Sequence, residues 1–164
     1  MVTIRTRVGQ GFDIHRFVEG PSDRVLILGG VQFPDERPLA GHSDADVIAH
    51  AVADALLGAA ALGDIGMHFP DTDPQWAGAH SLMLLEHVAT LVRGAGFEIG
   101  NVDCSIVCER PKIAPHREVM QKRLSDAVGA PVTVKGRRAE GLGAIGREEG
   151  IACWAVAVIE RTQA

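Results

Sequence analysis

The sequence predicts an α+β fold, in which a single mixed β-sheet carries helices on one face. Three observations support this class. The chain has 164 residues, which is enough to enclose one hydrophobic core. Predicted strands and helices alternate along it without a repeat, a low-complexity segment or a linker, so we expect one domain over residues 1–164. Hydrophobic residues make up 46% but aromatic residues only 4%, so the core must consist mainly of aliphatic side chains.

The first predicted elements are a long strand and a hairpin. Residues 4–12 are predicted to form a strand that runs into Asp13-Ile14-His15. Two short apolar stretches, at 25–28 and 31–33, flank the pair Gly29-Gly30. This pattern is typical of a β-hairpin.

A helix is predicted next, from Asp44 to Leu62. Ser43 is a suitable N-cap, and acidic residues in the first turn favour the positive end of the helix dipole. The segment from Gly63 to Gly78 is rich in turn-forming residues, so we expect a loop there.

The second half of the chain alternates helices with strands. Aliphatic residues at helical spacing predict a helix from Ser81 to Arg93 that stops at Gly94. The remaining predicted elements are a strand at 102–109, a helix at 115–128, and strands at 132–135 and 151–159. A glycine-rich loop joins the last two strands, which indicates sharp turns or close approach to a ligand.

Composition and charge exclude several kinds of partner. The net charge of -5 gives no electrostatic footprint for nucleic acid or for an anionic membrane. No apolar run reaches the ~20 residues that a bilayer span needs. The three cysteines cannot all pair and no apolar signal segment is evident, so we expect a cytoplasmic protein.

Asp13 and His15 are the first candidate site residues. Residues two apart on a strand project to the same face, so the carboxylate and the imidazole should converge while Ile14 points into the core. One oxygen and one nitrogen donor suit a cation such as Zn²⁺. The D-x-H pattern is also common by chance, and a helix cap or a surface pair would explain it equally well.

His50 is the second candidate, two turns into the predicted helix and surrounded by apolar residues. Burying an imidazole is costly unless it has a partner. It is either a core histidine that is hydrogen-bonded to Asp46 or Asp54, or a third metal ligand that one of these acids orients.

Other polar residues have both a functional and a structural explanation. His42 and Ser43 lie at the predicted helix N-terminus, where free N–H groups could bind a phosphate or simply receive a cap. Asp64, Asp71 and Asp73 could orient substrate hydroxyls or be solvated turn residues. The cysteines are more consistent with small core residues than with a metal site.

Three segments together resemble the 2-C-methyl-D-erythritol 2,4-cyclodiphosphate synthase family. They are Gly11 to Phe17 with its D-I-H core, Gly41 to His50 with H-S-D-A-D, and Leu62 to Asp73 with G-D-I-G and F-P-D-T-D. The likeness continues through residues 100–103, 110–116 and 146–152. It therefore spans nearly the whole chain in the same order.

This resemblance implies a fold, an assembly and a reaction. The subunit would be ferredoxin-like, with a mixed four- to five-stranded sheet, and three copies would surround a central channel with active sites at the subunit junctions. The implied reaction converts 4-CDP-2-C-methyl-D-erythritol 2-phosphate to 2-C-methyl-D-erythritol 2,4-cyclodiphosphate and CMP. It belongs to non-mevalonate isoprenoid precursor biosynthesis.

The resemblance also implies roles for individual residues. Asp13, His15 and His50 would hold one divalent metal ion per subunit, usually zinc. Glu140 would bind a second cation, Mg²⁺ or Mn²⁺, together with the substrate, and His42 would help to stabilise the transition state. The residues implied to contact substrate are Asp13, His15, His42, Ser43, Asp64, Ile65, Gly66, Phe69, Pro70, Asp71, Thr72, Asp73, Cys108, Pro111, Lys112, Ile113, Ala114, Arg137, Arg138, Glu140 and Arg147.

Two further expectations concern the channel and the glycine-rich loop. Phe12 and Arg147 match positions that bind a polyprenyl diphosphate in relatives, which implies an isoprenoid diphosphate as a partner. Relatives carry Lys-x-Thr-Thr-x-Glu where this chain has Lys-Gly-Arg-Arg-Ala-Glu at 135–140. Arg138 stands opposite the functional threonine, so it is expected either to contact a substrate phosphate or to project to solvent.

Two other functions are compatible with the residues. A metal-dependent phosphohydrolase would use the same three metal ligands but release inorganic phosphate. A trimeric metal- or isoprenoid-binding module without activity would explain the altered segment 136–139. The presence of His42, Lys112 and Glu140 argues against this second alternative.

Overall fold

The computed structural model describes residues 3–163, so Met1, Val2 and Ala164 of the expected domain lie outside the described part. Within it, the sheet strands and helices alternate as the sequence predicts. The elements are β1 (Thr3–Arg16), β2 (Leu26–Leu28), β3 (Val31–Phe33), α1 (Val47–Ala60), α2 (Ile65–His68), η1 (Pro74–Trp76), α3 (Ser81–Gly94), β4 (Glu98–Val107), η2 (Ala114–His116), α4 (Arg117–Val128), β5 (Val132–Arg137), α5 (Gly143–Gly146) and β6 (Gly150–Gln163).

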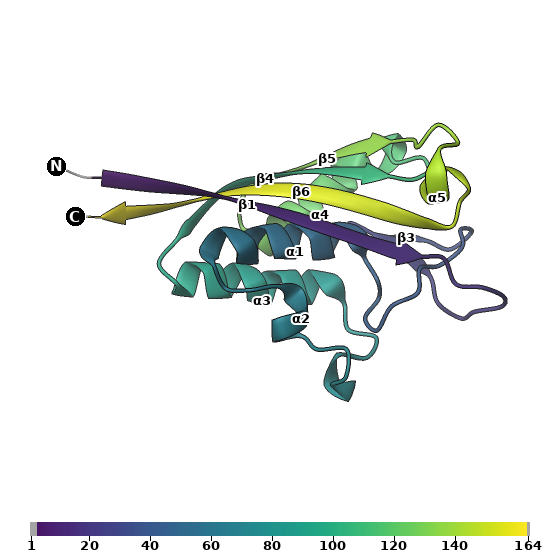
Figure 1. Ribbon diagram of the computed structural model, residues 1–164, viewed down its shortest axis with the longest axis horizontal. Helices are drawn as coiled ribbons and strands as arrows, with labels where there is room; N and C mark the ends of the chain where they lie inside the picture. Colours follow the sequence, from purple (N-terminus) through teal and green to yellow (C-terminus); the bar gives the residue numbers. More distant parts are fainter. Residues whose placement is uncertain (1–2, 164) are drawn as a thin grey trace.

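Four strands form one mixed sheet in the order β1-β6-β4-β5. β6 pairs antiparallel with both β1 and β4, whereas β4 and β5 run parallel. Helices α1, α3 and α4 all lie on one side of this sheet (Figure 1). The predicted α+β class, with a mixed sheet and helices on one face, is confirmed.

Helix α1 lies unusually close to β1 because two glycines on β1 face it. A Cβ atom on Gly11 would lie only 1.9 Å from the backbone oxygen of Ala51, and one on Gly9 would lie 2.0 Å from that of Ala55. Only glycine permits this approach of strand and helix. The contact brings the first turn of α1 directly over the carboxyl half of β1, where Asp13 and His15 lie.

The predicted hairpin is confirmed, but the predicted start of the long helix is wrong. β2 and β3 pair antiparallel around Gly29 and Gly30. Helix α1 begins at Val47 with Asp46 as its N-cap, so Ser43 is not the cap and His50 lies in the first turn rather than two turns in. The fully buried Asp46 carboxylate accepts hydrogen bonds from both glycine N–H groups as well as from the helix, which ties the hairpin to α1.

Two other features differ from the sequence predictions. β4 begins at Glu98, four residues early, because its first residues extend alongside the end of β6. The predicted 63–78 loop contains the short helices α2 and η1, each capped by an aspartate side chain. The predicted stop of α3 at Gly94 is confirmed.

The sheet face opposite the helices is uncovered in the single chain and carries exposed apolar side chains on β1 and β6. Ile14 lies on this face and is 50% exposed, so the expectation that it points into the core is wrong. The large side chains exposed here are Val8, Phe12, Ile14, Trp154 and Val156. Among residues 3–163, no helix combines the length and apolarity required to traverse a bilayer.

Candidate metal centre and ligand pocket

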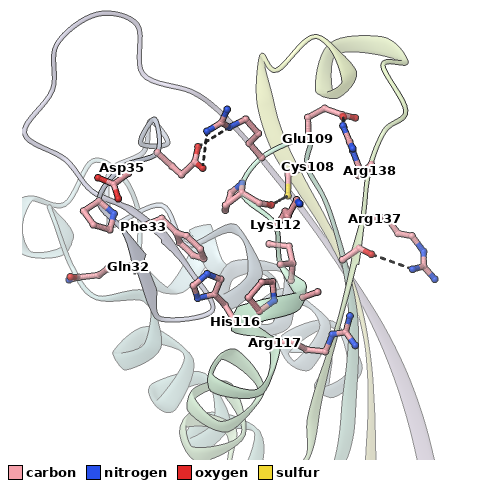
Figure 2. Close-up of a pocket in the computed structure, with 18 residues that line it drawn as sticks. Gln32, Phe33, Asp35, Cys108, Glu109, Lys112, His116, Arg117, Arg137 and Arg138 are labelled. Atoms are coloured by element: carbon pink, nitrogen blue, oxygen red, sulfur yellow. Dashed lines mark hydrogen bonds and ion pairs between the residues drawn. The ribbon is translucent and has the colours of Figure 1, made fainter.

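A cavity of about 800 Å³ opens where β4 and β5 end, on the carboxyl side of the sheet. Its walls contain the stretch from Cys108 to Arg117 and the residues Gly136 to Arg138. The hairpin closes the opposite side through Gln32 to Glu36, as Figure 2 shows. The structure therefore brings together the expected pocket residues Cys108, Pro111, Lys112, Ile113, Ala114, Arg137 and Arg138.

Arg138 in this pocket is engaged by a carboxylate. Its Nε and Nη2 groups donate to the Glu109 side chain at 3.1 and 3.0 Å. The Arg138 side chain is 68% exposed, whereas the Glu109 side chain is only 8% exposed. The hydrogen bond from Arg138 lowers the pKa of Glu109 below its usual value. The pair leaves Nη1 of Arg138 available to a ligand at the mouth of the pocket.

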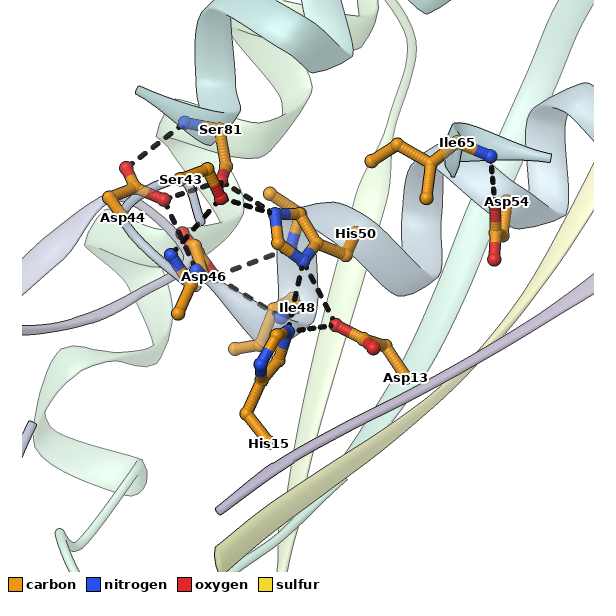
Figure 3. Close-up of polar contacts among 12 residues, drawn as sticks. Asp13, His15, Ser43, Asp44, Asp46, Ile48, His50, Asp54, Ile65 and Ser81 are labelled. Atoms are coloured by element: carbon orange, nitrogen blue, oxygen red, sulfur yellow. Dashed lines mark hydrogen bonds and ion pairs between the residues drawn. The ribbon is translucent and has the colours of Figure 1, made fainter. Parts of the chain in front are cut away.

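Asp13, His15 and His50 form a second site, on the helix side of the sheet (Figure 3). One donor atom from each residue lies within 4.8 Å of the other two. Oδ2 of Asp13 is 2.9 Å from Nε2 of His15 and 3.0 Å from Nδ1 of His50, and the two imidazole nitrogens are 3.3 Å apart. The spatial convergence that the sequence predicts is therefore present, and the three side chains remain partly open to solvent.

The far nitrogen of each imidazole has its own partner. Nδ1 of His15 lies 2.7 Å from the carbonyl oxygen of Ala40, to which it donates. Nε2 of His50 lies 2.8 Å from the Ser81 hydroxyl and 3.1 Å from the Ser43 hydroxyl. Such partners orient imidazoles at metal sites in proteins.

The prediction that Asp46 or Asp54 is hydrogen-bonded to His50 is wrong. The Asp46 carboxylate is occupied by backbone N–H groups of the hairpin and of α1. The Asp54 carboxylate instead accepts a hydrogen bond from the Ile65 N–H at 2.7 Å and so holds the start of α2. His50 is oriented by hydroxyl groups and not by either acid.

Electrostatics at the cluster favour a charged carboxylate. Burial by itself would raise the pKa of Asp13, but the neighbouring imidazoles of His15 and His50 outweigh this effect and hold that pKa well below its usual range. Burial likewise opposes protonation of His15, yet the Asp13 carboxylate raises the His15 pKa. The ionised Asp13 carboxylate thus attracts positive charge to the cluster.

The donor set fits a zinc-type cation. Two imidazole nitrogens and one carboxylate oxygen are ligands found at catalytic zinc sites, where three protein ligands leave a fourth position for water or substrate. A structural zinc site would require a fourth protein ligand, and the cluster found in residues 3–163 has only three.

His42 and Ser43 lie beside this cluster, although not at a helix terminus. Nε2 of His42 is 3.0 Å from the Asp73 carbonyl oxygen, and the buried Ser43 hydroxyl faces His50. The Asp46 side chain already accepts hydrogen bonds from the first N–H groups of α1. The prediction that free N–H groups at this helix end could bind a phosphate is therefore wrong. Arg24, which the sequence reasoning missed, fixes this loop by donating to the Leu39 and Ser43 carbonyls.

The segment 64–73 borders the same region, with mixed exposure. Asp64 and Asp73 cap the short helices α2 and η1, while Asp71 and Thr72 are exposed. Phe69 is buried and packs edge-on against Trp76 and His87, so it supports the segment from inside. Ile65, Gly66 and Pro70 lie in or next to α2.

The expected loop residues Glu140 and Arg147 lie outside both sites in the single chain. Glu140 is exposed with a φ of 54° and does not line the pocket. Arg147 donates to Glu149 at 2.6 Å. Phe12 lies on the open sheet face, where its ring packs 4.9 Å from Trp154.

Ser81 and Asp44 are two further site residues that sequence reasoning missed. Ser81 begins α3, and its link to His50 depends on how α1 and α3 pack. Its position at the start of a predicted helix was the only local signal, and that signal suggests capping rather than contact with a histidine 31 residues away.

The fold and the cluster together define a class: mixed α+β proteins with a two-histidine, one-carboxylate centre under one end of the sheet. The chain belongs to the YgbB family, whose model matches residues 6–160. A 2-C-methyl-D-erythritol 2,4-cyclodiphosphate synthase from Nostoc sp. (strain PCC 7120) is 53% identical over 161 residues, which is 96% of each chain.

Solved structures agree with this family. The chain matches the bifunctional IspDF from Campylobacter jejuni with a TM-score of 0.90 and 38% identity, over 97% of this chain but only 43% of that longer one. It matches the CDP complex of IspF from Plasmodium falciparum with a TM-score of 0.80 and 33% identity, over 94% and 95% of the two chains.

Proposed function

We propose that this chain is a divalent-metal-dependent lyase that converts 4-CDP-2-C-methyl-D-erythritol 2-phosphate to 2-C-methyl-D-erythritol 2,4-cyclodiphosphate and CMP. The observation that carries the proposal is the cluster of Asp13, His15 and His50, with its three donor atoms within 4.8 Å. Family membership supports it, since relatives about half identical over nearly their full length bear that enzyme's name.

The metal site is the first element of the mechanism. Asp13, His15 and His50 would hold a Zn²⁺ ion, and Glu140 would hold a second cation, Mg²⁺ or Mn²⁺, when substrate is bound. Bound cations supply Lewis acidity and neutralise charge on phosphate groups. The convergence of the Asp13 carboxylate and the two imidazoles within 4.8 Å supports this role.

Positioning of the substrate is the main task of the protein residues. The 2-phosphate oxygen attacks the β-phosphorus of the CDP group and expels CMP, so nucleophile and leaving group belong to one molecule. Holding them in line supplies much of the rate, and no protein nucleophile is needed. His42 and Ser43 beside the cluster would contact the reacting phosphates, and His42 would stabilise the transition state. Asp64, Ile65, Gly66 and Phe69 to Asp73 would line the sugar-alcohol site.

The cavity of about 800 Å³ would hold the cytidine part of the substrate. Its volume suits a nucleotide. Cys108, Pro111, Lys112, Ile113 and Ala114 would contact the cytosine, largely through backbone groups. Arg137 and Arg138, where relatives have threonines, would bind phosphate oxygens at its mouth.

A homotrimer around a central channel would complete the active site. The metal cluster lies at the β1 edge of the sheet and the cavity at the β4–β5 edge, with β6 between them. Both lie toward the same end of the sheet, so the cluster of one copy would face the cavity of a neighbour. The apolar face that bears Val8, Phe12 and Trp154 would line the channel, and Phe12 with Arg147 would bind an isoprenoid diphosphate at its end.

The deciding experiment follows CMP. Purified protein that is incubated with the CDP substrate, Zn²⁺ and Mg²⁺ should release CMP and a cyclic diphosphate, both detected by chromatography. His50→Gln should abolish product, whereas Lys122→Gln, on the exposed face of α4, should not. Release of inorganic phosphate would instead indicate a phosphohydrolase, and absence of any product would indicate an inactive binding module.

A further inference from the structure

The Nε2 atom of His50, which faces away from Asp13, contacts a hydroxyl group that has no part in the proposed chemistry. Ser81 is the first residue of α3 and is 1% exposed, and its Oγ lies 2.8 Å from Nε2 of His50. Ser81 also contacts Asp44 twice (Figure 3): its N–H donates to Oδ2 at 3.0 Å and its hydroxyl donates to Oδ1. The three side chains form one chain of hydrogen bonds, from α1 to α3 to the loop before α1.

This chain of hydrogen bonds fixes where the protons lie. A hydroxyl carries a single proton, and a carboxylate can only accept. Because the Ser81 proton is donated to Asp44, the Ser81 oxygen must accept from His50. His50 therefore carries its proton on Nε2, and in the neutral ring Nδ1 presents a lone pair to Asp13 and His15.

We propose that Ser81, with Asp44 as its acceptor, is a positioning residue that fixes His50 in the tautomer and orientation required to bind the metal ion through Nδ1. This inference rests on the proposed function. His15 is fixed in the opposite sense, because its Nδ1–H donates to the backbone carbonyl of Ala40 and its Nε2 faces the cluster. The neighbouring carbonyls of His50 belong to the α1 hydrogen-bond ladder, so a side chain from another helix takes that role.

Ser43 is the competing partner, and the geometry favours Ser81. The Ser43 oxygen is 3.1 Å from Nε2 of His50 and already accepts a hydrogen bond from the Ala45 N–H. Its own proton is not directed by a carboxylate. Ser81 is closer, and Asp44 sets the direction of its hydroxyl.

Zinc affinity tests the proposal without measuring catalysis. Zn²⁺ is titrated into metal-free protein against a chromophoric chelator. Ser81→Ala should bind Zn²⁺ about 10- to 100-fold more weakly, the usual effect of losing such a partner. Thr90→Ala removes a hydroxyl from the exposed face of the same helix and should bind as the wild type does. Wild-type protein that binds no zinc would overturn the proposed metal site, whereas equal affinity of wild type and Ser81→Ala would overturn this inference alone.

Two further measurements separate positioning from a general effect on folding. Asp44→Ala and the double variant Asp44→Ala/Ser81→Ala should lose about as much affinity as Ser81→Ala, because residues in one hydrogen-bonded chain are not additive. In ¹⁵N-labelled, zinc-loaded wild type, NMR should show His50 bound through Nδ1 with a protected proton on Nε2. A proton on Nδ1 would overturn the proposal even if the Ser81 variant does not fold.

Discussion

At the scale of single residues, the two sites differ in how their polar groups are satisfied. In the metal-type cluster, His15 and His50 both turn one nitrogen to Asp13 and the other to a fixed partner. In the pocket, Arg138 is exposed and forms an ion pair with Glu109. The first site is prearranged, whereas the second keeps a cation available at its edge.

Arg138 should contribute to substrate binding more than to turnover. Arg138→Ala should raise KM for the CDP substrate roughly tenfold with little change in kcat, because one hydrogen bond between charged groups is worth about 1.5–3 kcal/mol. Steady-state kinetics measure both constants. Lys122→Ala, which removes an exposed cation from α4, is the control and should leave KM unchanged. An unchanged KM in Arg138→Ala would remove this arginine from the site.

Cys108 should be chemically inert although it lies in the pocket wall. Burial, together with the negative charges of Glu109 and Glu36, raises the pKa of its thiol to about 12. At pH 8 the group is therefore protonated, and only the thiolate reacts. Iodoacetamide at pH 8 should leave Cys108 unlabelled in native protein and label it after unfolding in guanidinium, as peptide mass spectrometry would show. Rapid native labelling would contradict the described burial.

At the scale of elements, contacts between neighbouring segments decide where each one starts and what it carries. Glycines on β1 let α1 descend onto the strand, which places His50 over Asp13. Asp46 joins the start of α1 to the β2–β3 hairpin, and the hairpin forms one wall of the pocket. The metal-type site and the pocket are thus connected through one buried carboxylate.

Asp46→Asn should destabilise the fold by about 1–3 kcal/mol. The substitution replaces one carboxylate oxygen with an amide NH₂ group, which cannot accept the hydrogen bonds that buried backbone N–H groups donate there. Urea unfolding measures the change, and Asp126→Asn at the exposed end of α4 should stay within about 0.5 kcal/mol of wild type.

Asp46→Asn should also alter how the free energy of unfolding depends on pH. Burial and the nearby charge of Asp44 raise the pKa of Asp46 to about 6, above the usual 3.8. The folded state then holds more protons than the unfolded state between these values, so the stability that Asp46 contributes falls as pH rises from 4 to 6. Asp46→Asn should lack this slope, and an identical slope in both proteins would contradict the raised pKa.

At the scale of the whole molecule, one sheet face is covered by helices and the other is open. An apolar face with several exposed large side chains usually marks an interface. In the proposed trimer this face lines the channel, and the two halves of each active site come from different copies. A change that separates the copies should therefore also abolish activity.

Val156→Arg should break the trimer without unfolding the subunit. Val156 is 45% exposed on the open face, so a charge there costs little in the single chain but opposes an apolar interface. Val119→Arg, at a 48% exposed position on α4, is the matched control. Sedimentation should give three times the mass of one chain for wild type and the control, and a single chain without activity for Val156→Arg. A wild-type monomer would contradict the assembly.

The sequence by itself determined the local features and the family. The D-x-H strand, the Gly-Gly hairpin and the stop of α3 at Gly94 follow from backbone preferences that act over a few residues. The order of the motifs was sufficient for the family because it extends over the whole chain.

Only the tertiary structure decided the features that depend on distant contacts. Ser43 and Asp46 both suit a helix cap, and Asp46 is selected because the hairpin brings two more N–H groups to its carboxylate. Ser81 meets His50 because α3 packs against α1, which no local pattern encodes. Ile14 faces outward because its neighbours Asp13 and His15 face the helices, and alternation along a strand then leaves it the open side.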